Sequence, residues 1–168
     1  RLTGDTEWLR GVTPRLLRMC AWTRTQRAQA LAEDRPVLTR GLIRFRPYAD
    51  YPQEAFNYYG DAYCCVGLRY AADALARAGL TADAERASAE AAAYERDLRA
   101  SMDAALFEHD GRTLLPLEPD TRRIIMSTNY RGGDYYGLVA SMLLESGLLD
   151  VQARAAQVLV DTLEQDGG

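Results

Sequence analysis

The chain has 168 residues, of which 48% are hydrophobic, and this suffices for one domain with a substantial core. Its formal net charge of -4 argues against nucleic acid or an anionic membrane as the main partner. No apolar run reaches membrane-spanning length, and the first residues lack the pattern of a signal peptide.

The histidine and the cysteines limit the chemistry that we expect. His109 is the only histidine, so neither a catalytic triad nor a multi-histidine metal site is expected within this chain. Cys20, Cys64 and Cys65 lack metal-binding spacing, and two of them are neighbours in a predicted helix, which is a poor geometry for a disulfide. We expect core cysteines, no metal and no cofactor.

The first predicted helix covers residues 5–33. Gly4 suits the end of an outgoing helix and Asp5 suits the cap of an incoming one. We expect a bend near Thr13-Pro14, because proline is favoured at a first helical position. The residues expected to face the core are Leu16, Leu17, Cys20 and Leu31. A long connection with three prolines follows, over residues 35–52.

The stretch 54–79 is apolar almost all round, which predicts a helix buried on most sides. Small residues at spacings of three and four form a seam that would let a neighbouring backbone approach: Gly60, Cys64, Gly67, Ala71, Ala74 and Ala78. Polar residues gather at the N-terminal end among tyrosines, and Glu54, Asn57 and Asp61 would share one face.

The rest of the chain continues the alternation of inner and outer helices. Gly79 and Thr81 predict a tight turn into an amphipathic helix over 81–108. Its core stripe is expected to be Ala84, Ala87, Ala91, Tyr94, Leu98, Met102 and Ala105. Asp110-Gly111 predicts a turn, and residues 112–117 either pair as a short hairpin or pack as an extended loop. An apolar inner helix over 134–146 and an amphipathic outer helix over 150–165 complete the set.

The connections between these helices alternate in length. Those at 3–5, 79–81 and 147–150 are short, and the two between them are long. A stack of antiparallel hairpins places all short turns at one end and all long loops at the other. We therefore expect an all-α fold whose function lies at the long-loop end, which includes the polar start of the 54–79 helix.

Three segments resemble the six-hairpin glycosidases, whose fold is the (α/α)6 toroid. TGDTEWLRGVTPRLLRMCAWT resembles their Pro-containing helix with a Trp, residues 41–107 resemble the next hairpin, and SGLLD with the helix after it resembles the hairpin that follows. The resemblance implies that residues 1–168 are a single domain fragment, an incomplete arc of such a toroid. It also implies carbohydrate chemistry on an oligosaccharide or glycoside, with the remaining hairpins of the parent chain as partners.

Glycosidases of this kind use one carboxylic acid to protonate the glycosidic oxygen and another to activate water. Glu54 is the candidate catalytic residue, although an acid in a first helical turn also stabilises the helix dipole by about 0.3–1 kcal/mol. Asp50, Asp134 or a residue outside this chain would supply the second carboxylate. The candidate substrate-binding residues are Asp50, Tyr51, Asn57, Tyr58, Asp61, Asn129, Asp134 and Tyr135.

Each candidate also has a structural interpretation. Asp61 could bond across to a neighbouring inner helix, and the tyrosines could form either a sugar-stacking platform or a core between hairpins. The alternative function is a non-catalytic helical-hairpin scaffold that binds a protein or glycan on its long-loop face. An open arc would expose apolar flanks, so we also expect the isolated chain to self-associate.

Overall fold

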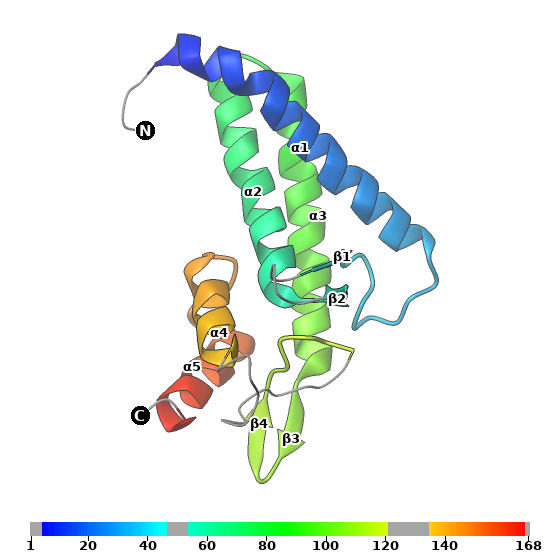
Figure 1. The fold of residues 1–168 in the computed structure, drawn as a ribbon, viewed down its shortest axis with the longest axis vertical. Coiled ribbons are helices and arrows are strands. Elements are labelled where there is room, and N and C mark those ends of the chain that lie inside the picture. The colour runs from blue at the N-terminus through cyan, green and yellow to red at the C-terminus, as the bar shows by residue number, and fades with distance from the viewer. Residues whose placement is uncertain (1–4, 47–53, 121–134, 167–168) are drawn as a thin grey trace.

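A computed structural model describes residues 5–46, 54–120 and 135–166. This part of the chain is predominantly helical, as predicted, and carries two small antiparallel ribbons (Figure 1). The helices are α1 (Thr6–Ala32), α2 (Tyr58–Arg77), α3 (Thr81–Ala105), α4 (Tyr135–Glu145) and α5 (Arg154–Asp166). The strands are β1 (Arg44–Phe45) paired with β2 (Ala55–Phe56), and β3 (Phe107–His109) paired with β4 (Arg112–Leu114).

The antiparallel hairpin of α2 and α3 supplies half of the buried hydrophobic residues. Every residue of the predicted α3 stripe is buried, from Ala84 to Ala105. The tight turn is also confirmed: Gly79 takes φ +84°, and the Leu80 amide donates to the Leu75 carbonyl at 2.9 Å, which closes the end of α2. Thr81, expected as the cap of α3, is instead its first helical residue.

Helix α1 begins as predicted, and the face expected to contact the core is confirmed in part, because Leu17 and Cys20 pack against buried residues of α2 and α3. The Asp5 side chain accepts from the Trp8 amide at 2.8 Å. Pro14 lies within the helix, whose first turns run at an angle to the rest (Figure 1). Leu31 is exposed, and Leu16, Leu17 and Cys20 are only half-buried. The buried residues of α1 are Thr13, Thr23, Arg27 and Ala30.

The predicted start of the second helix, at Glu54, is wrong. Helix α2 begins at Tyr58, because the Asn57 side chain caps it by accepting from the amides of Tyr59 and Gly60 at 3.0 and 3.4 Å. Residues 55–56 instead pair with residues 44–45 as strands. Glu54 therefore lies outside the helix and shares no helical face with Asn57 and Asp61.

The third helix ends earlier than predicted, at Ala105. The residues after it form β3, which pairs with β4 across a turn at Asp110 and Gly111. Both turn residues have positive φ, 50° and 77°, as the favoured two-residue hairpin turn requires. Of the two arrangements left open for residues 112–117, the hairpin is the one formed.

The helices contact one another in a regular order. Helix α2 contacts α4, α3 contacts α5, and α1 lies against both α2 and α3. The turn after α2 and the start of α1 lie toward one end of the molecule, and the β3–β4 ribbon lies toward the other, whereas the turn after α4 lies level with the β1–β2 ribbon (Figure 1). The predicted separation of short and long connections therefore holds for the start of α1 and the α2–α3 hairpin but is wrong for the turn after α4, which lies against the middle of α2 through the bond from Arg69 to the Gly147 carbonyl.

Helix α2 is less enclosed than its sequence predicts. Its side toward α3 is packed, but Tyr63, Gly67 and Tyr70 are exposed. A Cβ atom placed on Gly67 would meet nothing within 4 Å. At Gly67 the small-residue seam therefore meets open space among the described residues, whereas Ala71 of the same seam is buried.

Candidate functional site

The structure describes only part of the predicted site. Asp50, Tyr51, Asn129 and Asp134 lie outside the described residues. Tyr135 is the first residue of α4, and its side chain also lies outside the description. The geometry of the candidate site therefore rests on Glu54, Asn57, Tyr58 and Asp61 and on the groups around them.

Glu54 is a solvent-exposed residue immediately before β2. Its backbone carbonyl accepts from Arg44 Nη2 at 3.4 Å. Because Glu54 precedes α2 by several extended residues, its carboxylate does not act on the α2 dipole from a first helical turn. What the structure offers is a carboxylate at the long-loop end that solvent and solutes can reach.

Asn57 and Tyr58 both fasten the start of α2 to the protein. Asn57 is buried, and its side-chain oxygen accepts the hydrogen bonds that cap α2. The Tyr58 hydroxyl is hydrogen-bonded to Ser101 Oγ at 2.7 Å, and Ser101 in turn donates to the Leu38 carbonyl at 2.6 Å. Burial raises the pKa of Tyr58 well above its usual range. Tyr58 has no exposed surface for a sugar, so its expected role as a substrate-binding side chain is corrected to a structural one.

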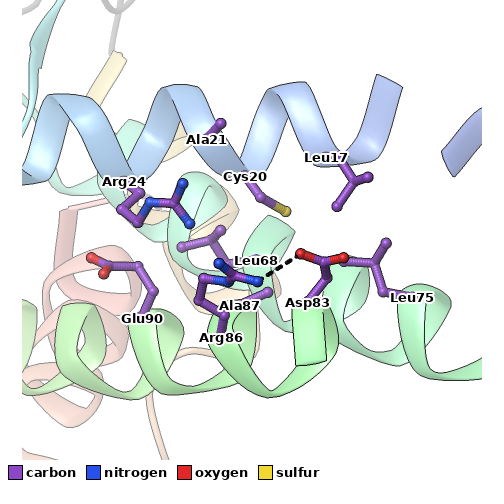
Figure 2. A pocket seen from close by; sticks show the side chains of 10 residues that line it. All are labelled: Leu17, Cys20, Ala21, Arg24, Leu68, Leu75, Asp83, Arg86, Ala87 and Glu90. Atoms are coloured by element: carbon purple, nitrogen blue, oxygen red, sulfur yellow. Dashed lines mark hydrogen bonds and ion pairs between the residues drawn. The ribbon is translucent and has the colours of Figure 1, made fainter. Parts of the chain in front are cut away.

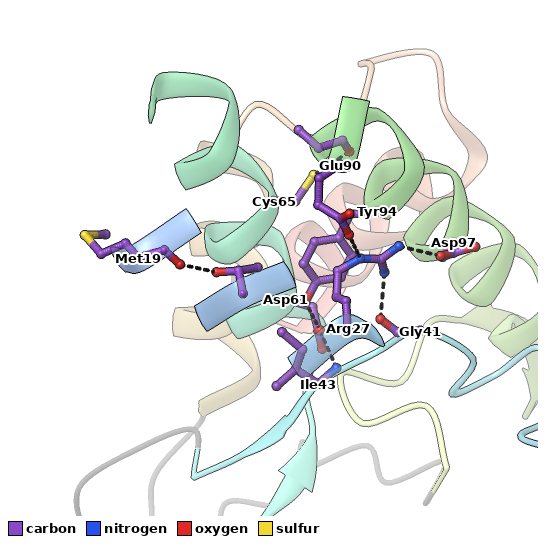
Figure 3. Close-up of polar contacts among 11 residues, drawn as sticks. Met19, Arg27, Gly41, Ile43, Asp61, Cys65, Glu90, Tyr94 and Asp97 are labelled. Carbon is purple, nitrogen blue, oxygen red and sulfur yellow. Dashed lines mark hydrogen bonds and ion pairs between the residues drawn. The ribbon is translucent and has the colours of Figure 1, made fainter. Parts of the chain in front are cut away.

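Asp61 is enclosed completely, one turn into α2. Its Oδ1 accepts from the Ile43 amide at 2.9 Å and from the Tyr94 hydroxyl, whereas Oδ2 has no partner (Figure 3). Burial raises the pKa of the Asp61 carboxyl to about 7, although both hydrogen bonds and the nearby charge of Arg27 oppose the shift. Asp61 thus joins the loop before β1 to α3, and because it has no exposed surface, its expected role in substrate binding is corrected to a structural one.

Arg27 is the centre of a polar cluster that the sequence did not predict. Only 1% of its surface is exposed. Its three guanidinium nitrogens donate to Glu90 at 2.7 Å, to Asp97 at 2.8 Å and to the Gly41 carbonyl at 2.7 Å (Figure 3). The guanidinium also lies over the Tyr94 ring, 4.1 Å from its centroid.

A signal for this cluster was present in the sequence. Glu90, Tyr94 and Asp97 follow one another at spacings of four and three, so they share a face of α3. Such a polar row beside the apolar stripe predicts a cation from a neighbouring element. With every nitrogen of Arg27 used inside the protein, the cluster joins α1, α3 and the loop before β1 and is structural.

Glu118 is a second carboxylate at the long-loop end that the sequence analysis did not single out. It is 8% exposed, within a buried segment that follows β4. The preceding residue, Leu117, accepts from the Tyr58 amide at 3.1 Å, which brings this segment beside the first turn of α2. The available signal was a single acid between Pro116 and Pro119 in an otherwise apolar run.

A cavity of about 250 Å³ lies between α1, α2 and α3 (Figure 2). Cys20 faces it together with charged residues of α3, among them Asp83, which pairs with Arg86 at 3.0 Å. Burial raises the pKa of the Cys20 thiol, which disfavours the nucleophilic thiolate. The lining residues include no histidine and no pair of groups suited to nucleophile and base.

The described residues contain neither a candidate metal site nor a helix that could span a membrane. In residues 5–46, 54–120 and 135–166, no group of three or more His, Cys, Asp or Glu side chains could hold a metal ion. None of the helices described is both long and apolar enough to span a membrane. In comparisons with known proteins, no family model, no curated protein and no solved structure matches the chain significantly.

Proposed function

We propose that this chain is part of an (α/α)6-type barrel that cleaves glycosidic bonds of an oligosaccharide or glycoside. The observation that carries the proposal is the order of helix contacts: α2 packs on α4, α3 packs on α5, and α1 packs on both α2 and α3 (Figure 1). Successive hairpins arranged around a common axis would have this order. Rigid scaffolds of this kind carry their chemistry on the longer loops.

Glu54 and Glu118 are the described residues that fit the required chemistry. A base that activates water must be reachable by water, and Glu54 is exposed. A donor of the leaving-group proton is commonly a carboxyl that the protein encloses, and Glu118 is buried beside the start of α2. Asp50 and Asp134 remain alternatives for either role. An inverting pair would stand roughly 6.5–9.5 Å apart.

The test uses Glu54→Gln and Glu118→Gln in the full-length protein, with turnover followed on a panel of oligosaccharides and glycosides. Ligand binding is measured separately by calorimetry. Loss of turnover with retained binding supports a catalytic role. Glu85→Gln is the control, because Glu85 is an exposed residue of α3 near the short-turn end. Unchanged rates in both test variants would remove these residues from the mechanism.

The buried roles of Tyr58 and Asp61 favour the second candidate function, a non-catalytic scaffold that binds a protein or glycan at the long-loop end. Two side chains expected to contact a substrate are enclosed by the protein instead. The same panel separates the two functions. A scaffold would bind a glycan or a protein without turnover, and neither glutamine substitution would alter a rate.

A further inference from the structure

An apolar groove of about 670 Å³ runs between α1 and α2. Large side chains on its walls are exposed: Met19 by 62%, Trp22 by 51% and Tyr70 by 68%. The lining residues are Leu16, Arg18, Met19, Cys20, Trp22, Thr23, Tyr63, Cys64, Gly67, Leu68, Tyr70 and Ala71, and Arg18 is the one charged member. A contiguous apolar surface of this kind marks a site of contact with another element.

The α2 wall of the groove is shaped to receive a helix. Cys64, Gly67 and Ala71 are small and recur at spacings of three and four, so they form one strip along α2. The open space beyond Gly67 has room for further atoms, because a Cβ placed there meets nothing within 4 Å. A helix can pack closely against such a strip, with larger side chains seated on either side of it.

The position of the groove around α2 is informative. Arg69 donates to the Gly147 carbonyl at 3.3 Å, so the turn that follows α4 lies on the Arg69 side of α2. Gly67 is two residues away and hence about 200° around the helix axis from Arg69. The groove is therefore on the flank of α2 opposite α4.

The hairpin order indicates what occupies that flank. Outer helices α3 and α5 each follow an inner helix, α2 and α4, through a short turn that contains a glycine, Gly79 or Gly147. Helix α1 packs on α2 and α3. A glycine stands two residues before the first helical residue in both α1 and α3, so Gly4-Asp5-Thr6 corresponds to Gly79-Leu80-Thr81. By the same order, an inner helix precedes α1.

We propose that the groove between α1 and α2 is the seat of an apolar α-helix that the same polypeptide supplies ahead of α1. This helix runs parallel to α2, because it reaches α1 through a turn at the short-turn end. It covers Met19, Trp22 and Tyr70 and packs against the strip around Gly67. The inference rests on the barrel of the proposed function, and it names the contact that continues the inner layer.

The first test fills the strip in the full-length protein. Gly67→Leu should lower the Tm by several degrees, because the added side chain enters space that the incoming helix occupies. Ala76→Leu is the matched control: Ala76 is an exposed residue of the same helix, about 180° from Gly67. It should leave the Tm unchanged or slightly raised. An equal or higher Tm for Gly67→Leu would overturn the proposal, and Gly67→Ala supplies the same comparison if the leucine variant does not fold.

The second test follows Trp22 fluorescence in the full-length protein, taken as the difference between its emission and that of the Trp22→Phe variant. A blue-shifted emission that iodide does not quench, in a protein that sediments as a monomer, supports the proposed helix. A shielded Trp22 in a dimer would assign the groove to a second copy of the chain and overturn the proposal. A Trp22 that iodide quenches would show that the groove is empty and would also overturn it. None of these measurements involves a sugar. A protein that is inactive on sugars but has a shielded Trp22 would therefore refute the proposed function and leave the proposed helix standing.

Discussion

Asp61→Asn should change how the stability of the protein depends on pH. The Asp61 carboxyl is fully buried, its Oδ2 has no partner, and burial raises its pKa from 3.8 to about 7. In the folded state the carboxyl therefore keeps its proton over a pH range where the unfolded chain has lost it. The folded protein binds more protons there, so its free energy of unfolding falls as pH rises from about 4 to about 7.

The size of the effect follows from the shift. A difference of about three units, at about 1.4 kcal/mol per unit, corresponds to about 4 kcal/mol of stability that is present below pH 4 and lost above pH 7. Asparagine keeps an oxygen that can accept from the Ile43 amide and the Tyr94 hydroxyl, but it does not titrate. The difference in unfolding free energy between variant and wild type should thus shift by about 2–3 kcal/mol in favour of the variant from pH 5 to pH 7.

Urea unfolding at pH 5, 6, 7 and 8, followed by circular dichroism, measures this difference. Asp73→Asn is the control, because Asp73 is an exposed acid on the same helix, and its profile should run parallel to that of the wild type. Parallel profiles for Asp61→Asn and the wild type would show that folding leaves the pKa of Asp61 unchanged. The account of a buried, protonated carboxyl would then be wrong.

Three further predictions concern stability and association. Arg27→Met should lower the unfolding free energy by about 3 kcal/mol, because it breaks a buried ion pair. This value is near the lower end for such pairs, since Glu90 and Asp97 keep partial access to water. A loss under 1 kcal/mol in urea unfolding would contradict this prediction. Asn57→Ala should cost about 1 kcal/mol through loss of the α2 cap, whereas an unchanged denaturation midpoint would mean that the cap contributes nothing. Residues 1–168 alone should self-associate through the exposed groove, and a monomeric sedimentation profile with a cooperative melt would argue against a truncated barrel.

Periodic features of the sequence predicted the helices well. The α3 stripe from Ala84 to Ala105 was predicted residue by residue, because seven apolar side chains at helical spacing can be buried together in only one way. Gly79 and the Asp110-Gly111 turn were predicted because their positive φ angles follow from local residue chemistry. The all-α class followed from these elements.

The failures occurred where contacts between distant segments decide the structure. The helical periodicity of the sequence extends to Glu54 and therefore predicted the wrong start for the second helix. The pairing of residues 55–56 with 44–45 and the cap at Asn57 make α2 begin at Tyr58. Arg27 was not among the residues expected to face the core, because its partners Glu90, Asp97 and Gly41 lie far away in the sequence. Asp61 was placed near a substrate for the same reason: nothing local indicates Tyr94 or Ile43 as its partners.

The loop between α1 and β1 is fastened by side chains from three different helices, and this arrangement dictates an order of folding. Arg27 donates to the Gly41 carbonyl, Ser101 donates to the Leu38 carbonyl, and Asp61 accepts from the Ile43 amide. These groups reach their positions only after α1, α2 and α3 have come together. The α2–α3 hairpin has short-range contacts and can form early, whereas the loop docks late. Once docked, the Ile43 amide should exchange with solvent deuterium only when the three-helix assembly opens as a unit.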